Sequence, residues 1–170
     1  MRPPLGLEGG KVALAENDPR WQALYEAERQ RLLDAIGPQI LDIQHFGSTS
    51  IPGIRAKPIL DILVGLPDFD AGNALVAPMT ALGYDYVGIE MVPNDHLFGL
   101  GEPRTHLVHA VVHGGYHWNR NLRFRDQLRA QPSLAAAYEA LKVDLAASFA
   151  DNRAGYTAAK QSFIDKIADG

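Results

Sequence analysis

Residues 58–66, with the sequence Pro-Ile-Leu-Asp-Ile-Leu-Val-Gly-Leu, constrain the fold of this chain more than any other stretch. The run is apolar at odd and even positions alike, so it predicts a central strand that is covered on both faces of a sheet. Its one charged residue, Asp61, needs a partner, because an unpaired buried charge costs several kcal/mol. Asp61 is therefore either paired structurally or kept for a cation or a proton.

Hydrophobic periodicity predicts the elements on both sides of this strand. Further strands are expected at residues 40–46, 84–89, 96–100 and 105–113, and helices at 18–37, 71–82, 118–149 (interrupted at Pro132) and 153–168. A helix, then a mixed region, then further helices indicate an α/β or α+β fold with a helical C-terminal layer. Residues 1–15 contain several Pro and Gly residues and are expected to form an irregular arm, with residues 16–170 as a single domain.

Composition excludes several classes of protein. The net charge of −4 argues against a broad electropositive surface for nucleic acid. The chain has no cysteine, which excludes disulfides, cysteine zinc sites and thiol nucleophiles and fits a reducing compartment. No apolar run approaches the roughly 18 residues that span a membrane. We therefore expect a soluble, cytoplasmic protein with no membrane partner.

The loop at residues 47–57 is rich in small residues and joins two predicted strands. Its backbone N–H groups, with the hydroxyls of Ser48 and Thr49, suit phosphate oxygens, and an arginine and Lys57 add positive charge. Asp61 on the next strand suits Mg²⁺, which one or two carboxylates usually bind together with substrate phosphates. An equally good alternative is that the loop is only a tight turn, in which Asp61 pairs with the arginine or with Lys57. The loop lacks the Gly-x-x-x-x-Gly-Lys-Ser/Thr pattern of a Walker loop.

Two neighbouring segments form a recognisable signature: His-Phe-Gly-Ser-Thr-Ser-Ile-Pro-Gly at residues 45–53 and Lys-Pro-Ile-Leu-Asp-Ile at residues 57–62. Together they resemble the signature of the GrpB family. Residues 104–109, 121–129 and 156–160 are also similar to its pattern, so the resemblance covers roughly residues 16–168. By resemblance that family belongs to the nucleotidyltransferase superfamily, which has the polymerase-beta-type fold.

The resemblance implies a nucleotidyltransferase-like mixed sheet with helices packed on it, and a particular site. Members of this superfamily place Gly-Ser on a turn against nucleotide phosphates. Two acids spaced Asp-x-Asp on the next strand, with a third acid, hold two Mg²⁺ ions. Gly47 and Ser48 match the turn, and Asp61 matches the first acid. The second acid is replaced by Leu63, and residues 104–113, where a third acid is expected, contain none.

Histidines supply the other candidates, since five of the six fall within residues 96–117. Imidazole is a common metal ligand. On a strand, His109 would share a face with His113 and His106 would point the other way, so no closed zinc motif emerges. His109 is expected to face Asp61 as a metal ligand or a general base.

The remaining candidates lie on loops and helices. His113 and His117 are expected to be solvated loop residues. His45, directly before the Gly-Ser turn, either orients the loop, donates to a phosphate or makes a structural hydrogen bond. Most arginines after residue 118 are expected to form a solvated helix face, while Arg125, in the family-like Phe-Arg-Asp, and Lys160 are expected to reach the substrate.

These residues leave two main functions open. In the first, the chain is an enzyme that binds a nucleoside triphosphate with Mg²⁺ and transfers a nucleotidyl group to a small acceptor. In the second, it is a binding module for a nucleotide or another phosphorylated small molecule, without chemistry. Leu63 favours the second, whereas the intact loop and Asp61 favour the first. A phosphate reaction that uses one metal ion and a histidine is a third alternative.

Overall fold

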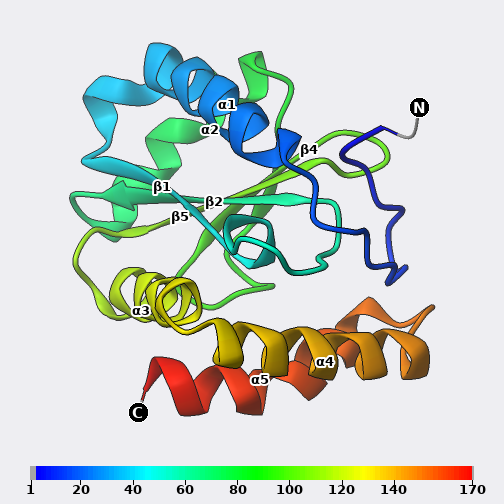
Figure 1. The fold of residues 1–170 in the computed structure, drawn as a ribbon. Coiled ribbons are helices and arrows are strands. Elements are labelled where there is room, and N and C mark those ends of the chain that lie inside the picture. The colour runs from blue at the N-terminus through cyan, green and yellow to red at the C-terminus, as the bar shows by residue number, and fades with distance from the viewer. Residues whose placement is uncertain (1–2, 170) are drawn as a thin grey trace.

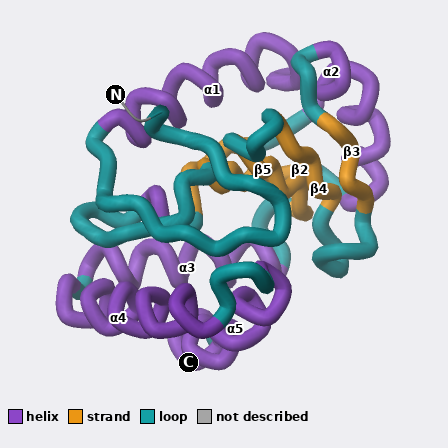
Figure 2. Tube along the Cα trace, turned by 90° about the vertical axis from the view of Figure 1, so that its right-hand side faces the viewer, coloured by secondary structure: helices purple, strands orange, loops and turns teal. Residues whose placement is uncertain are grey.

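A five-stranded mixed sheet lies between two layers of helices in the computed structural model, which describes residues 3–169 (Figure 1). One face of the sheet is covered by α1 (Arg20–Ile36) and α2 (Val76–Ala81). On the opposite side lie α3 (Tyr116–Ala130), α4 (Pro132–Ser148) and α5 (Arg153–Ala168). The same layers are visible from the side in Figure 2. The expected α/β class with a helical C-terminal layer is confirmed.

The sheet has the order β1-β2-β5-β4-β3, so β2 lies in its interior. The strands are β1 (Asp42–Phe46), β2 (Leu60–Leu66), β3 (Asp85–Gly88), β4 (His96–Leu100) and β5 (His106–Val112). Only β2 and β5 pair in parallel, and the other neighbours are antiparallel. The strand predicted from the apolar run at residues 58–66 is thus flanked on both sides, as a strand apolar on both faces requires.

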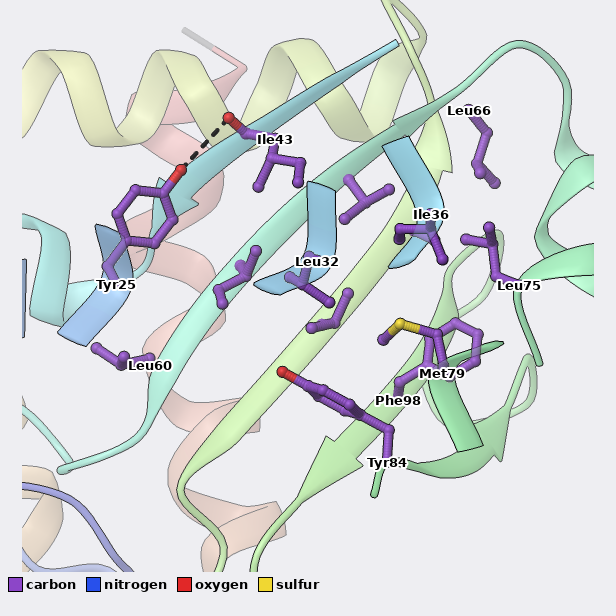
Figure 3. Close-up of a cluster of buried hydrophobic side chains, with 14 of the residues drawn as sticks. Tyr25, Leu32, Ile36, Ile43, Leu60, Leu66, Leu75, Met79, Tyr84 and Phe98 are labelled. Atoms are coloured by element: carbon purple, nitrogen blue, oxygen red, sulfur yellow. Dashed lines mark hydrogen bonds between the residues drawn. The ribbon is translucent and has the colours of Figure 1, made fainter. Parts of the chain in front are cut away.

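The two faces of β2 enter different cores. On the α1 face, its even-numbered residues are fully buried and pack with side chains from α1 and α2 (Figure 3). On the other face, Leu63 packs with Val111 and Trp118 and is itself fully buried. Replacing one such leucine by alanine costs about 2–5 kcal/mol. Asp61 lies on the Leu63 face, at the end of β2 where the loop arrives.

The helical layer is tied to the sheet by the loop at residues 47–57. Ile51 and Ile54 are buried and pack with Leu128, Ala135 and Tyr138 of the helical layer. Because these two side chains leave water only against α3 and α4, the position of the loop depends on the helices that follow much later in the chain. The loop therefore lies at the junction of two hydrophobic cores.

Two segments differ from regular helix or strand. The helix expected at residues 71–82 begins as a 3-10 helix over Phe69–Leu75, and only α2 is α-helical. Pro78 accounts for part of this, because it has no N–H to donate to residue 74. The N-terminal arm is fixed by isolated bridges from Leu7 to Arg104 and from Ala15 to Ala56. None of the helices within residues 3–169 has the length and apolar content needed to cross a bilayer.

Candidate functional site

The turn after β1 lies directly against Asp61. Gly47 has φ +72°, and a Cβ atom built there would be 2.5 Å from Asp61 Oδ2. Only glycine satisfies both the backbone and this close approach. A 3-10 turn over Ser48–Ser50 follows, in which the Ser50 N–H donates to the Gly47 carbonyl at 3.1 Å. The sequence thus brings the small-residue turn and the lone acid together.

Asp61 is the first member of a chain of alternating carboxylates and imidazoles. Its Oδ1 lies 3.7 Å from Nε2 of His109 on β5. His109 Nδ1 donates to Oδ2 of Asp95 at 3.0 Å, and His117 Nδ1 lies 3.2 Å from Asp95 Oδ1. Asp95 is only 2% exposed, whereas the Asp61 side chain is 30% exposed and open to a ligand. We call these four residues the carboxylate–histidine chain.

Within the carboxylate–histidine chain, each charged group stabilises the charged form of its neighbour. Burial alone would lower the pKa of His109, but the hydrogen bonds and charges of Asp61 and Asp95 raise it to about 9. Burial would raise the pKa of Asp61, but His109, Lys57 and Lys160 outweigh it and hold that pKa below its usual value. These shifts favour a carboxylate at Asp61 beside an imidazolium at His109. The role expected for His109, as a metal ligand or a general base, stays a prediction.

The donor set fits one metal ion and does not fit two. The position of the second acid is Leu63, which is fully buried in an apolar cluster. Asp95 Oδ2 accepts from His109, and Asp95 Oδ1 is buried 3.2 Å from His117 Nδ1 without a hydrogen bond to the described residues. Within residues 3–169, no three acidic, histidine or cysteine side chains are grouped in a way that could hold a metal ion. Asp61 alone suits the mode in which Mg²⁺ is bound by a single carboxylate, phosphates and water.

Three of the five lysines in the sequence lie near one another, and two of them, Lys57 and Lys160, act on Asp61. The Nζ atoms of Lys57 and Lys160 lie 5.2 and 4.9 Å from the centroid of the Tyr156 ring. Lys142, which is 1% exposed, lies 4.9 Å from the Tyr138 ring and donates to the Arg55 carbonyl at 2.6 Å. We call Lys57, Lys142 and Lys160 the lysine cluster.

The lysine cluster holds more positive charge than its surroundings neutralise. Burial, followed by repulsion from the other lysines, lowers the pKa of Lys57 and of Lys142 to about 7. Burial also lowers the pKa of Lys160, although Asp61 opposes the shift. Asp61, the carboxylate that acts on Lys57 and Lys160, is already paired with the His109 imidazolium. An anion entering this region would therefore be attracted and would restore the lysine charges.

A buried hydroxyl lies in the same region without a partner. Tyr156 is fully buried, and its hydroxyl has no hydrogen-bond partner within the part of the chain that the structure describes. Buried tyrosine hydroxyls usually have one. Beside it, burial raises the pKa of Tyr138 to about 12, with the Ser48 hydroxyl acting in the opposite direction. The Tyr156 hydroxyl is a donor that a ligand oxygen could satisfy.

The structure divides the predicted substrate residues into two groups. Gly47, Ser48, Lys57 and Lys160 lie on the Asp61 side. In contrast, His45 faces α1, where its ring stacks on Tyr25 at 4.6 Å, and Arg125 donates to the His45 carbonyl at 2.9 Å. Thr49 is buried between the groups, with its hydroxyl 2.9 Å from His45 Nε2. The roles of all these residues stay predictions.

Three residues of the site were not identified from the sequence. Asp95 belongs to a Pro-Asn-Asp run that is typical of a turn, but the register of β4 with β5 places Leu97 beside His109 and so residue 95 on the same face. His117, expected to be solvated, lies against Asp95. Lys142 follows Tyr138 by one helical turn, and this spacing signals a buried face.

Comparisons with known proteins agree with this architecture. The family model described as GrpB protein matches residues 11–169. The glutamate-rich protein GrpB of Alkalihalophilus pseudofirmus is 36% identical over 169 residues, which cover 96% of this chain and 97% of that protein. A crystal structure of the conserved protein GrpB from Enterococcus faecalis has a TM-score of 0.85 at 33% identity, covering 92% and 95% of the two chains. Cid1 in complex with its short product ApU shares the fold, with a TM-score of 0.51 at 14% identity over 75% of this chain and 40% of Cid1.

Proposed function

The chain belongs to the GrpB family, and from its site we propose that the protein binds a nucleoside triphosphate beside Asp61. The lysine cluster is the observation that carries this proposal. Lys57, Lys142 and Lys160 are close enough to repel one another, and burial followed by this repulsion lowers the pKa of each of Lys57 and Lys142 to about 7. Several neighbouring phosphates would relieve this repulsion better than a single carboxylate does.

Mg²⁺ is expected to enter together with the phosphates. Asp61 already faces the His109 imidazolium and two lysines, so its affinity for free Mg²⁺ is expected to be weak. When bound, Mg²⁺ would offset phosphate charge at Asp61. The lysine cluster would take over part of the charge neutralisation that a second ion performs in two-metal sites. His109, held by Asp95, would keep the Asp61 carboxylate in place.

Nucleotidyl transfer to a small acceptor is the second candidate function. It is favoured by the 30% exposure of Asp61 and by its contact with the Gly47 turn. By resemblance, this pair matches the first acid and the phosphate turn of the superfamily. The fold shared with Cid1 is consistent with this candidate. The loss of the second acid at Leu63 is the reason for placing binding before transfer.

Thermal unfolding in the presence of nucleotides tests the binding proposal. Each of ATP, GTP, CTP and UTP at millimolar concentration should raise the Tm, and more strongly with Mg²⁺, whereas Mg²⁺ alone should shift it little. In Asp61→Asn the additional effect of Mg²⁺ should disappear. If no triphosphate shifts the Tm of the wild-type protein with or without Mg²⁺, the proposal is wrong.

Product analysis separates binding from transfer. Pyrophosphate release from a triphosphate should depend on an added acceptor and on Mg²⁺ if the second candidate is right, and Asp61→Asn should abolish it. Stabilisation by triphosphates without pyrophosphate release across hydroxyl, amine and phosphate acceptors would support a binding module. In that case the retained Asp61 serves ligand binding.

A further inference from the structure

A cavity of about 300 Å³ lies at the outer edge of β1, between α1 and α3. It contains none of the lysine cluster and does not include Asp61. A volume of this size is at the lower end of small-ligand pockets. The side chains that matter for its chemistry are Arg29, Arg125, Arg129, Glu26 and His45. We call it the arginine cavity.

The arginine cavity carries an excess of positive charge. Three arginines line it, with the single carboxylate of Glu26 at an exposed position where it accepts from Gln22 at 3.0 Å. Arg29 is half-buried yet makes no hydrogen bond or ion pair with any residue between 3 and 169. The donors of its guanidinium group are therefore available to a ligand.

The other two arginines are held by oxygen atoms of the protein. Arg125 donates to Gln44 Oε1 and to the His45 carbonyl, both at 2.9 Å, and pairs with Asp126. Arg129 donates through Nε to the Ser50 carbonyl at 3.0 Å. Its terminal nitrogens make no hydrogen bond to the described residues. Burial, followed by repulsion from Arg125, lowers the pKa of Arg129. Arg29 on α1 and Arg129 on α3 thus both have donors that are not used within the described chain.

A buried histidine in the lining of the cavity supplies an independent observation. His45 is 3% exposed, and its Nε2 is engaged with Thr49. Its Nδ1 has no hydrogen-bond partner among residues 3–169. The ring is fixed by stacking on Tyr25, whose hydroxyl points to the Ile43 carbonyl (Figure 3). An unpaired buried polar atom is costly, so a group that bonds to Nδ1 would stabilise the arrangement.

We propose that the arginine cavity is a second ligand site, which binds a phosphorylated small molecule through Arg29 and Arg129. Guanidinium groups match the geometry of phosphate oxygens and keep their charge at any physiological pH. The amides of Gln22 and Gln44 and the Glu26 carboxylate offer partners for hydroxyl or amino groups on the remainder of the ligand. The proposal does not rest on the function proposed for Asp61, since the two sites share no residue.

The same geometry couples this cavity to the turn beside Asp61. His45 contacts Thr49, and Arg129 contacts the carbonyl of Ser50, so two of the lining residues hold the 3-10 turn that follows Gly47. A ligand that repositions either side chain acts on the turn. By reciprocity, any such effect on triphosphate affinity must equal the effect of triphosphate on the cavity.

Titration of the full chain with inorganic phosphate and with ribose 5-phosphate, at constant ionic strength, tests the proposal. Side-chain NMR signals of the arginines and histidines locate each binding event. We expect the signals of Arg29, Arg129 and His45 to move, both in the wild type and in Lys57→Gln, which disables the other site. Arg29→Gln should weaken this binding about tenfold, as expected for loss of a charged hydrogen bond.

Arg20→Gln is the matched control, because Arg20 lies on the same helix, pairs with Asp18 and does not line the cavity. It should leave phosphate affinity unchanged. The proposal is overturned if the arginine and His45 signals stay fixed up to about 10 mM phosphate. It is also overturned if Lys57→Gln abolishes the binding while Arg29→Gln does not. Arg29 has no partner within the described chain, so its variant is expected to fold normally.

Discussion

The lysine cluster and the arginine cavity lie on the two sides of one turn, and they hold positive charge in different ways. The lysines are packed against tyrosine rings, and the pKa values of Lys57 and Lys142 are lowered to about 7. The arginines are fixed by carbonyl and amide oxygens and stay charged. The first site can therefore change its charge with pH or on binding a ligand, whereas the second cannot.

The largest expected effect concerns the carboxylates that support each site. Asp95 is 2% exposed between two histidines, so Asp95→Asn should destabilise the protein by about 3 kcal/mol, because the buried His109 loses one of the two carboxylates that pair with it. Asp126, paired with Arg125 but 61% exposed, is the matched position on the arginine side. Asp126→Asn should cost at most about 1 kcal/mol. Urea unfolding of both variants measures the difference, and equal costs would contradict the contrast between the two sites.

In the wild type, the pairing of His109 with its carboxylates should make the unfolding free energy depend on pH. The pKa of His109 is raised from 6.5 to about 9, so the stability contributed by its charged form is fully present below pH 6.5 and is lost as pH rises through about 9. At about 1.4 kcal/mol per pKa unit this is about 3 kcal/mol. The depressed pKa values of Lys57 and Lys142 oppose it, because above pH 7 the unfolded state binds more protons at both lysines. Asp95→Asn should reduce the loss of stability between pH 6.5 and 9.

The next largest effect is the loss of triphosphate affinity when the lysine cluster is reduced. Lys160→Gln should raise the Kd for a nucleoside triphosphate by about 10- to 100-fold, since it removes a charged contact. Lys166→Gln, on the same helix but exposed, should change the Kd little. Phosphate binding in the arginine cavity should be equal in both variants. Calorimetric titration measures these affinities. Equal Kd values for the two lysine variants would show that Lys160 does not belong to the triphosphate site.

A smaller expected effect is that ligand affinity depends on pH at the lysine cluster and not at the arginine cavity. Above pH 7, Lys57 and Lys142 are expected to lose their protons, so triphosphate affinity should fall between pH 7 and 9 by up to about tenfold per pH unit for each of the two lysines that binding must protonate. Phosphate affinity of the arginine cavity should stay flat over the same range. Triphosphate binding at pH 8 should take up protons, which titrations in buffers of different ionisation enthalpy detect. Proton release on binding would contradict this assignment.

The smallest effect concerns the turn between the two sites. Gly47→Ala adds a methyl group 2.5 Å from Asp61 Oδ2 at φ +72°, whereas Gly53→Ala has a similar φ of +80° and no atom within 4 Å. Both variants carry backbone strain, so their difference in unfolding free energy isolates the contact with Asp61. We expect Gly47→Ala to be less stable than Gly53→Ala by about 1 kcal/mol. Equal stabilities would mean that the turn moves away from Asp61 at little cost.

The fold was largely predictable because its signals are local. The run at residues 58–66 indicated a central strand, and the structure places β2 inside the sheet. The prediction for residues 71–82 was wrong over its first half, where a 3-10 helix precedes α2. In that segment Pro78 and the close packing of Gly72 against His96 outweigh the apolar periodicity. Local patterns thus predicted where helices and strands occur better than whether a helix is an α-helix or a 3-10 helix.

The candidate site was less predictable because it is assembled across the chain. The sequence indicated Asp61 and His109, and the structure places them 3.7 Å apart. The role of Asp95 depends on the register between β4 and β5, which no local pattern specifies. Arg125 was expected beside the phosphates but contacts β1 at its outer edge, because the rotation of α3 against the sheet decides which side it faces.

The burial of Ile51 and Ile54 against the C-terminal helices has a consequence for the order of events during translation. The turn and β2 leave the ribosome long before α4 and α5, so these two isoleucines stay in water until the last helices have been made and have docked. Lys142 and Lys160 arrive at the same late stage. If the proposed triphosphate binding is right, a triphosphate should protect the nascent turn from proteases only after α4 and α5 have been made.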